Sequence, residues 1–364
     1  MSVYNDLRVK VAAVQDGPVL KDAPQWFDAD ATVDKAVRLI EEASGQGARL
    51  VVFPECWMPS FPYWSMDFTD RLTFREIWAR YLLASVEVPG KETKALCTAA
   101  KNAGAYVVMG INERDSRFQG RMYNSILYIS PQGEILGTHR KICNTVQERF
   151  FHTPGDGGEN LNTVFNTDIG IIGGTMCGEH AQLGLAQHWI MQGIQIHCSL
   201  WPGEMGLETL TDIRSRNICC TARCFGVVAS TYISEEDKPK NFYKNSLFNI
   251  PKSIRGGSGV IDPNGRYIAG PVYDEATIVY ADIDLFETYK SRFETNVVGI
   301  YSRWDLISLN VRQETYEPVV PMKQLPDGMP VEPPPESREG LEERVRRLEQ
   351  RIASLTEKPE DKGP

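Results

Sequence analysis

The chain has 364 residues, of which 42% are hydrophobic and 24% charged, proportions typical of globular proteins that exclude fibrous and wholly disordered classes. Its formal net charge of −9 disfavours nucleic acid or an anionic membrane as the main partner. Eight cysteines are too few for a disulfide scaffold, so we expect reduced thiols. The charged first residues do not resemble a signal peptide, and no segment reaches the roughly 18 consecutive apolar residues of a membrane span. These features predict a cytoplasmic protein.

The first hundred residues predict a β–α–β unit followed by irregular and helical segments. Residues 7–14 indicate a strand, an apolar stripe over 30–44 indicates a helix, and residues 49–53 indicate a buried strand. A right-handed crossover between the two strands places functional groups just beyond the second strand, where Glu55 lies. The aromatic, proline-broken segment 56–64 cannot be regular structure, and a helical stretch is expected within 71–103.

The middle of the chain predicts a hairpin and then renewed alternation of helices and strands. Strands are expected near 105–112, 123–130 and 135–140, the last two joined by a turn at 131–133. A glycine-rich loop over 153–160 precedes a strand pair that ends at 169–174. The elements expected after it are helix 180–192, strand 194–199, helix 207–223, strand 225–232 and two further strands around 259–262 and 278–282.

Beyond about residue 312 the composition changes. Seven prolines fall within 318–335, which predicts an extended linker. Residues 341–355 then carry apolar side chains at spacings of four and three, a seam two heptads long. A helix this short is not stable alone, so the segment is either an assembly element or a frayed, charged tail. The sequence therefore predicts a main domain at 1–312, an extended tail at 313–340, and a short charged helix with a disordered end at 341–364.

Cys177 is the first candidate for a nucleophile, because it lies between an apolar strand and a helical run. A thiol at such a turn is exposed at the edge of the sheet, next to backbone N–H groups that can bind an oxyanion. The helix N-terminus is expected to lower the pKa of the thiol. The alternative is a small buried core residue, which is what most free cysteines are.

Three charged residues at or after predicted strand ends complete a possible site. Glu55 suits a general base, because burial among the aromatic residues of 57–63 would raise the pKa of its carboxyl group. Lys141 could supply a fixed positive charge, and Glu148 could orient that lysine or direct water. Each of the three could also be a surface or capping residue.

The order and the local strings around these four residues resemble the carbon–nitrogen hydrolase (nitrilase) superfamily, and within it the nitrilase branch. The resemblance covers roughly residues 7–312. The matching segments are Phe53-Pro-Glu-Cys-Trp57 with Pro59 and Tyr63-Trp64, His139-Arg-Lys141, Glu148-Arg149 with Gly155-Asp-Gly157, Cys177-Gly-Glu179, Gln195-Ile-His-Cys-Ser-Leu-Trp-Pro202, Gly256-Gly-Ser-Gly259 with Asp262-Pro-Asn-Gly265, and Val298-Gly-Ile-Tyr-Ser-Arg303.

The resemblance implies an α/β fold, a four-layer α-β-β-α sandwich, for the domain at 1–312. It implies Cys177 as nucleophile, Glu55 as base, Lys141 as charge stabiliser and Glu148 as a second essential acid. It also implies a homo-oligomer built from dimers, which in nitrilases often extends to spirals or filaments. Many nitrilases have a tryptophan where this chain has Gly178, and the glycine is expected to widen the pocket beside the thiol.

Five residues near the predicted site are candidates for substrate binding, although the aromatic ones could equally be core residues and the histidine a packed one. They are Trp57, Tyr63, Gly178, His197 and Trp201.

The resulting prediction is a hydrolase without cofactor or metal that converts a small organic nitrile to the acid and ammonia. No nucleotide-binding glycine motif occurs, and the cysteines at 219, 220 and 224 lack a second pair at zinc spacing. One alternative is an amidase, carbamoylase or nitrile-hydrating activity on the same four residues. A remote alternative is an inactive assembly protein.

Overall fold

The structure is a computed structural model that describes residues 7–65, 70–240, 242, 246–312, 346, 349 and 350. The chain divides into two units, Met1–Thr315 and Tyr316–Pro364. The tail expected at 313–340 and most of the helix expected at 341–364 lie outside the described residues. Within that second segment, Arg346, Glu349 and Gln350 are helical and exposed.

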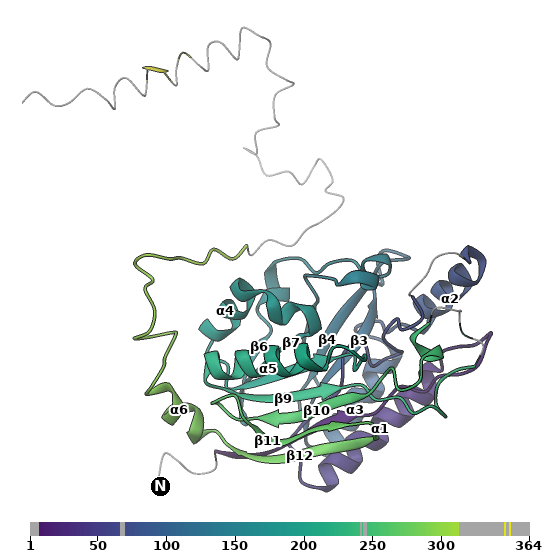
Figure 1. Cartoon of the computed structure of the whole chain (residues 1–364), viewed down its shortest axis with the longest axis horizontal. Coiled ribbons are helices and arrows are strands. Elements are labelled where there is room, and N and C mark those ends of the chain that lie inside the picture. The colour runs from purple at the N-terminus through teal and green to yellow at the C-terminus, as the bar shows by residue number, and fades with distance from the viewer. Residues whose placement is uncertain are drawn as a thin grey trace, which may run out of the picture. The chain divides into compact units, whose positions relative to one another are not determined.

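Two six-stranded sheets form the centre of the first unit (Figure 1). The first sheet has the order β12-β1-β2-β3-β4-β5 and the second the order β11-β10-β9-β8-β7-β6. The strands are β1 (Arg8–Gln15), β2 (Leu50–Val52), β3 (Tyr106–Arg114), β4 (Met122–Ile129), β5 (Ile135–Arg140), β6 (Val164–Thr167), β7 (Gly170–Met176), β8 (Ile196–Trp201), β9 (Phe225–Ser230), β10 (Gly256–Ile261), β11 (Tyr267–Tyr273) and β12 (Thr277–Asp284).

Helices cover the outer face of each sheet. The helices are α1 (Ala29–Gly45), α2 (Arg71–Ala84), α3 (Lys91–Ala103), α4 (Leu183–Met191), α5 (Glu208–Ala222) and α6 (Phe286–Arg292). Side chains of α1 and α3 pack on the first sheet, and side chains of α4 and α5 pack on the second. The fold is therefore the expected four-layer α-β-β-α sandwich.

The alternation of side chains along a strand explains the layers. In β1, Val9, Val11 and Ala13 enter the core between the two sheets, whereas Ala12 and Val14 enter the core beneath the helices. Both faces of the central strands are thus covered by apolar side chains, which is why their sequences are almost continuously hydrophobic.

The directions of the strands place Glu55 and Lys141 at the same end of the first sheet. Strand β2 pairs in parallel with β3, and the β3–β4 and β4–β5 pairs are antiparallel, so β2 and β5 run in the same direction. Glu55 follows the carboxyl end of β2 and Lys141 follows the carboxyl end of β5, so both residues lie at the same end of the sheet.

Three elements differ from the sequence predictions. The helical stretch expected at 71–103 is two helices, α2 and α3, because Pro89 and Gly90 interrupt it. Strand β11 and helix α6 were not predicted. Gly270 and Pro271 within β11 are turn-forming residues and hid the strand pattern.

None of the helices in the described part of the chain combines the length and the apolar character needed to cross a bilayer.

Candidate active site

The four candidate residues stand where regular elements end. Glu55 follows β2 and Lys141 follows β5, while Glu148 lies in the short 3-10 turn Val146–Phe150. Cys177 directly follows β7 and opens the 3-10 turn Cys177–Ala181. All four side chains are buried, with Cys177 retaining 8% exposure.

Lys141 joins the two glutamates. Its Nζ atom lies 2.7 Å from Oε1 of Glu55 and 2.6 Å from Oε2 of Glu148. The amide of Asn124 on β4 also bridges them, since its Nδ2 donates to Glu55 Oε1 at 2.7 Å and to Glu148 Oε1 at 2.5 Å. Asn124 was not predicted from the sequence, because no local signal sets it apart from an ordinary strand residue.

Thr145 fixes the Glu148 carboxylate. Its backbone N–H and its hydroxyl both donate to Glu148 Oε2, at 2.8 and 2.5 Å, and the hydroxyl accepts from Lys141 Nζ at 3.3 Å. Glu148 therefore receives several hydrogen bonds that favour its charged form.

The electrostatic environment separates the two carboxyl groups. Burial raises the pKa of Glu55 to about 7, with Lys141 opposing the rise and Glu148 adding to it. Burial also acts on Glu148, but Lys141 and the other hydrogen-bond donors outweigh it and lower the pKa. The two carboxylates hold the pKa of Lys141 well above its usual value despite burial. The site thus contains a fixed ion pair and one carboxyl group that titrates near neutrality.

Cys177 stands in a strained backbone conformation at the turn that follows β7. Its φ of 42° lies in the left-handed region that side chains other than glycine rarely adopt. Contrary to the sequence-based expectation, the pKa of the thiol is raised well above its usual value, first by burial and then by Glu55, with Lys141 opposing. A short 3-10 turn follows the cysteine and α4 begins only at Leu183, so the thiol does not lie at the N-terminus of that helix. The thiol therefore needs a base to become a nucleophile.

A buried pair, Glu179 and His139, ties the nucleophile turn to the end of β5. The carboxylate of Glu179 lies 3.1 Å from His139 Nε2 and accepts from the N–H of Ile142 at 2.7 Å. Burial opposes a charge on His139, but the Glu179 carboxylate raises the pKa of the imidazole overall. Neither residue was predicted from the sequence to have a role in the site. Their contacts hold the chain on both sides of Lys141 against the turn that carries Cys177.

Gly178 lies against the side chain of Thr145. A Cβ atom at this position would lie 2.9 Å from Cγ2 of Thr145, closer than carbon atoms pack. Thr145 thus occupies the place into which a side chain at 178 would extend, while the expected wider pocket beside the thiol stays a prediction.

The other candidates for substrate binding lie in three different surroundings. Trp57 packs on Phe53 beneath the helices of the first sheet and donates its indole N–H to Asp16 O, as a core residue would. Tyr63 donates its hydroxyl to Pro202 O, and Trp201 packs in one cluster with Cys177.

His197 lies behind the nucleophile turn. Its Nε2 is 3.3 Å from His180 Nε2, and the other ring nitrogen of His180, Nδ1, is 2.9 Å from the backbone oxygen of Cys177. His197 therefore supports the turn that carries Cys177 through its contact with His180.

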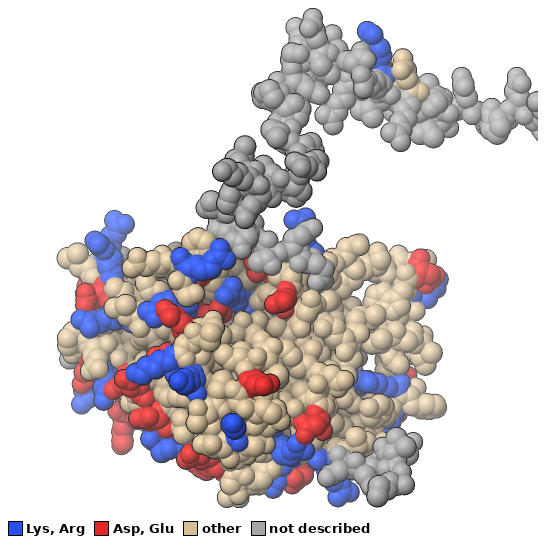
Figure 2. Space-filling model, turned by 180° about the vertical axis from the view of Figure 1, so that it is seen from behind, with Lys and Arg blue, Asp and Glu red and all other residues tan. Residues whose placement is uncertain are grey.

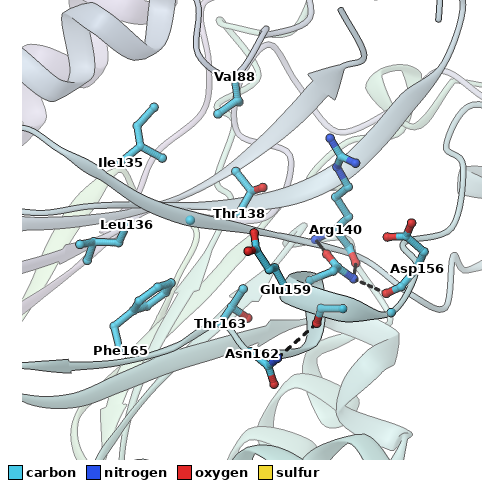
Figure 3. A pocket seen from close by; sticks show the side chains of 14 residues that line it. Val88, Ile135, Leu136, Thr138, Arg140, Asp156, Glu159, Asn162, Thr163 and Phe165 are labelled. Carbon is cyan, nitrogen blue, oxygen red and sulfur yellow. Dashed lines mark hydrogen bonds between the residues drawn. The ribbon is translucent and has the colours of Figure 1, made fainter. Parts of the chain in front are cut away.

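A separate cavity of about 700 Å³ lies between the edge strands β5 and β6 (Figure 3). Its walls include Leu136, Arg140, Glu159 and Phe165, and none of the four candidate catalytic residues. The guanidinium of Arg140 is bound by Glu113 and stacks on Tyr123. This cavity is thus distinct from the candidate active site.

Comparison with known proteins identifies the family of the chain. The carbon-nitrogen hydrolase family matches residues 10–293. An aliphatic nitrilase of Sinorhizobium fredii is 34% identical over 309 residues, covering 83% of this chain and 97% of the relative. An arylacetonitrilase of Aspergillus oryzae is 34% identical over 326 residues, covering 85% and 93%. A bifunctional nitrilase/nitrile hydratase of Lupinus angustifolius is 32% identical over 335 residues, covering 87% and 90%.

Solved structures show the same fold at lower identity. Nit3 of Saccharomyces cerevisiae, a member of branch 10 of the nitrilase superfamily, matches with a TM-score of 0.62 and 20% identity over 80% of this chain and 95% of its own. The NitFhit protein of C. elegans matches with a TM-score of 0.64 and 18% identity over 85% and 69%. With the family match and the curated relatives, this establishes that the chain belongs to the carbon–nitrogen hydrolase, or nitrilase, superfamily.

Proposed function

We propose that this carbon–nitrogen hydrolase is a nitrilase, which converts an organic nitrile to the carboxylic acid and ammonia through covalent intermediates on Cys177. The observation that carries the proposal is the separation of roles among the buried groups. Lys141 and Glu148 form a fixed ion pair, while Glu55 has a pKa of about 7 and can exchange a proton at neutral pH. The relatives named as aliphatic nitrilase and arylacetonitrilase support a nitrile as substrate.

The first step forms a thioimidate. Sγ of Cys177 adds to the nitrile carbon as Glu55 takes the thiol proton and passes it to the nitrile nitrogen. The ammonium of Lys141 stabilises the negative charge that develops on this nitrogen. Glu148, Asn124 and Thr145 keep the lysine in place through the contacts described above.

The following steps release ammonia and then the acid. Water adds to the thioimidate carbon with Glu55 as base, which gives a tetrahedral intermediate. When its C–N bond breaks, the nitrogen leaves as ammonia and a thioester remains. A second water cleaves the C–S bond of the thioester, so that one nitrile and two waters yield one acid, one ammonia and the free thiol.

An amide is the product if the tetrahedral intermediate loses the thiol in place of ammonia. The relatives named as bifunctional nitrilase/nitrile hydratase favour this second outcome as a side reaction. Each 1.4 kcal/mol between the two barriers changes the ratio of acid to amide by about tenfold. An amidase or carbamoylase activity on the same residues is the alternative within the same chemistry.

Ammonia release from matched nitriles and amides tests the proposal. We expect higher kcat/KM for the nitriles, with acid as the main product, and no turnover in Cys177→Ala. Higher kcat/KM for the amides would favour the amidase alternative. Absence of turnover on both panels, together with an unreactive Cys177, would favour an inactive assembly protein.

A further inference from the structure

His180 is a buried histidine to which the reaction above gives no role. It lies three residues after Cys177 in the 3-10 turn Cys177–Ala181, and only 2% of its surface is exposed. Its Nδ1 atom is 2.9 Å from the backbone oxygen of Cys177, and its Nε2 atom is 2.7 Å from Oγ of Ser199 on β8. Both ring nitrogens therefore have a hydrogen-bond partner, and one of these partners belongs to the nucleophile.

The chemistry of the two partners determines which ring nitrogen of His180 carries the proton. A carbonyl oxygen can only accept a hydrogen bond, so the contact with Cys177 O requires a proton on Nδ1. Burial lowers the pKa of His180 well below its usual value, so the ring is neutral and its Nε2 atom is an acceptor. The hydroxyl of Ser199 then donates to Nε2.

Trp201 and Ser215 leave the proton of Ser199 available for His180. The indole N–H of Trp201 can only donate, and it donates to Ser199 Oγ at 2.8 Å. The hydroxyl of Ser215 on α5 lies 2.8 Å from Ser199 Oγ and can donate to it as well. The hydrogen bonds thus run in one direction, from Trp201 through Ser199 and His180 to the carbonyl group of Cys177.

Two further contacts hold the imidazole ring in place. The indole of Trp201 stacks on the ring of His180 with 4.8 Å between the centroids. On β8, Nε2 of His197 lies 3.3 Å from Nε2 of His180, and a proton on the His197 atom fits this contact because the His180 atom is an acceptor. Nε2 of His180 therefore faces donors, which disfavours the tautomer that carries its proton there.

The hydrogen bond from His180 acts on a strained residue. Cys177 has a φ of 42°, and such a conformation persists only where the surroundings hold it. The peptide group between Cys177 and Gly178 is planar, so a hydrogen bond to its carbonyl oxygen also sets the direction of its N–H. His180 thereby fixes the backbone on the carboxyl side of the nucleophile.

We propose that His180 is a positioning residue, which holds Cys177 in its reactive conformation by donating from Nδ1 to the Cys177 carbonyl oxygen, and that Ser199 and Trp201 fix the required tautomer. This inference rests on the proposed function, in which Cys177 is the nucleophile. It gives Trp201 a role in the site that does not require contact with the substrate.

Two substitutions of His180 separate its hydrogen bond from its packing. Asparagine offers an amide N–H in place of Nδ1, whereas leucine fills similar space without a donor. In His180→Leu we expect kcat for a nitrile to fall by about ten- to hundredfold and KM to change less than about threefold, because the nucleophile is misplaced. His180→Asn should recover most of the kcat. The matched control is His188→Gln, at a histidine of α4 that contacts Leu161 O, for which kcat and KM should not change.

Nitrogen-15 NMR of the full chain, labelled at histidine, measures the tautomer directly. The signals of His180 are those that disappear in His180→Asn. We expect them to show a neutral ring with its proton on Nδ1 between pH 6 and 8. In Ser199→Ala the donor to Nε2 is lost, so the tautomer should shift towards Nε2–H and kcat should fall in the same direction as in His180→Leu.

Three outcomes would overturn the inference. They are a proton on Nε2 of His180 in the unmodified protein, an unchanged kcat in a folded His180→Leu, and a folded His180→Asn that recovers none of the loss. The NMR result does not depend on turnover. If no nitrile is hydrolysed, the proposed function fails, and the rate of alkylation of Cys177 by iodoacetamide replaces kcat in the same variants, with the same order expected.

Discussion

Two buried glutamates share one lysine, yet their pKa values move in opposite directions. Glu148 accepts from Thr145 as well as Lys141, so its charged form is well satisfied. Glu55 accepts from Lys141 and Asn124 at Oε1 only, and its buried Oε2 has no partner among the described residues. Oε2 of Glu55 is therefore the atom that we expect to take a proton from the thiol and from water.

The pH dependence of the reaction should follow Glu55. Because burial raises its pKa to about 7, the carboxylate needed as base is lost as the pH falls below that value. We expect kcat/KM for an uncharged nitrile to fall about tenfold per pH unit below 7 and to level off above it. A profile that stays flat between pH 5 and 8 would contradict the assignment of Glu55 as base.

The close approach of Gly178 to Thr145 allows the role of Thr145 in the site to be tested by substitution. In Gly178→Ala the new methyl group would displace Thr145 and disturb its bonds to Lys141 and Glu148. We expect kcat/KM to fall by about tenfold, because a displaced Thr145 no longer holds Lys141 and Glu148 in their reactive positions. Adding Thr145→Ser should restore most of the loss, because serine keeps the hydroxyl and lacks the methyl group.

A matched control for this pair is Gly45→Ala, because a Cβ atom at residue 45 meets no atom within 4 Å. Its kcat/KM should equal that of the unmodified protein. Failure of Thr145→Ser to rescue Gly178→Ala would show that the contact with Thr145 is not the cause of the loss.

At the scale of elements, the sequence predicted the parts of the fold whose signals are local. The β–α–β unit at the start and the hairpin of β4 and β5 are confirmed by their pairing. These elements have regular apolar patterns bounded by glycine or proline. Strand β11 was not predicted, because Gly270 and Pro271 interrupt its pattern and its pairing with β10 is irregular. Strand β11 can be recognised only from its pairing with β10.

The residues of the candidate site also divide into those with a local sequence signal and those without one. Glu55, Lys141 and Cys177 could be singled out because each follows a predicted strand, and the structure brings Glu55 and Lys141 into contact. Asn124 and Glu179 were missed, because their partners are distant in the sequence: Asn124 binds Glu55, 69 residues away, and Glu179 binds His139, 40 residues away. Such contacts depend on tertiary packing, which periodicity does not encode.

His197, the buried histidine of β8, should make the free energy of unfolding depend on pH. Burial lowers the pKa of His197 to about 3 in the folded state, so only the unfolded chain takes up its proton as the pH falls below about 6.5. This residue alone should therefore lower the free energy of unfolding by about 1.4 kcal/mol per pH unit between 6 and 4.

Denaturant unfolding of His197→Gln at several pH values measures this contribution. The variant should lose that part of the slope, whereas His188→Gln, at a half-buried histidine, should change the slope less. Equal slopes for His197→Gln and the unmodified protein between pH 6 and 4 would contradict a neutral, buried imidazole.

At the scale of the whole molecule, the surface of the first unit combines mixed charges with exposed apolar side chains. Lysines, arginines, aspartates and glutamates are interspersed on the face shown in Figure 2, with no single-sign patch dominating it. Large exposed hydrophobic residues lie on α5 and α6 and within 298–309, among them Ile213, Tyr289, Ile300 and Ile307. Exposed apolar residues in such number favour self-association, and we propose that the protein is a homo-oligomer.

The residues proposed for catalysis all belong to the first unit, so the end of the chain should affect assembly more than chemistry. Removal of residues 318–364 is expected to leave kcat/KM within about twofold and to reduce the size of the particle in light scattering. Full-length chain with Leu348→Glu and Ile352→Glu is the matched control for the heptad seam. Unchanged particle size in both variants would contradict a role of this segment in assembly.

The proposed mechanism requires that the substrate becomes covalently bound to Cys177. Rapid acid quenching during turnover of a nitrile, followed by mass spectrometry of peptides, tests it most directly. We predict an acyl group on the peptide that contains Cys177, and neither adduct nor turnover in Cys177→Ala. An adduct on Cys56, the buried thiol next to Glu55, or undiminished turnover in Cys177→Ala would contradict the account.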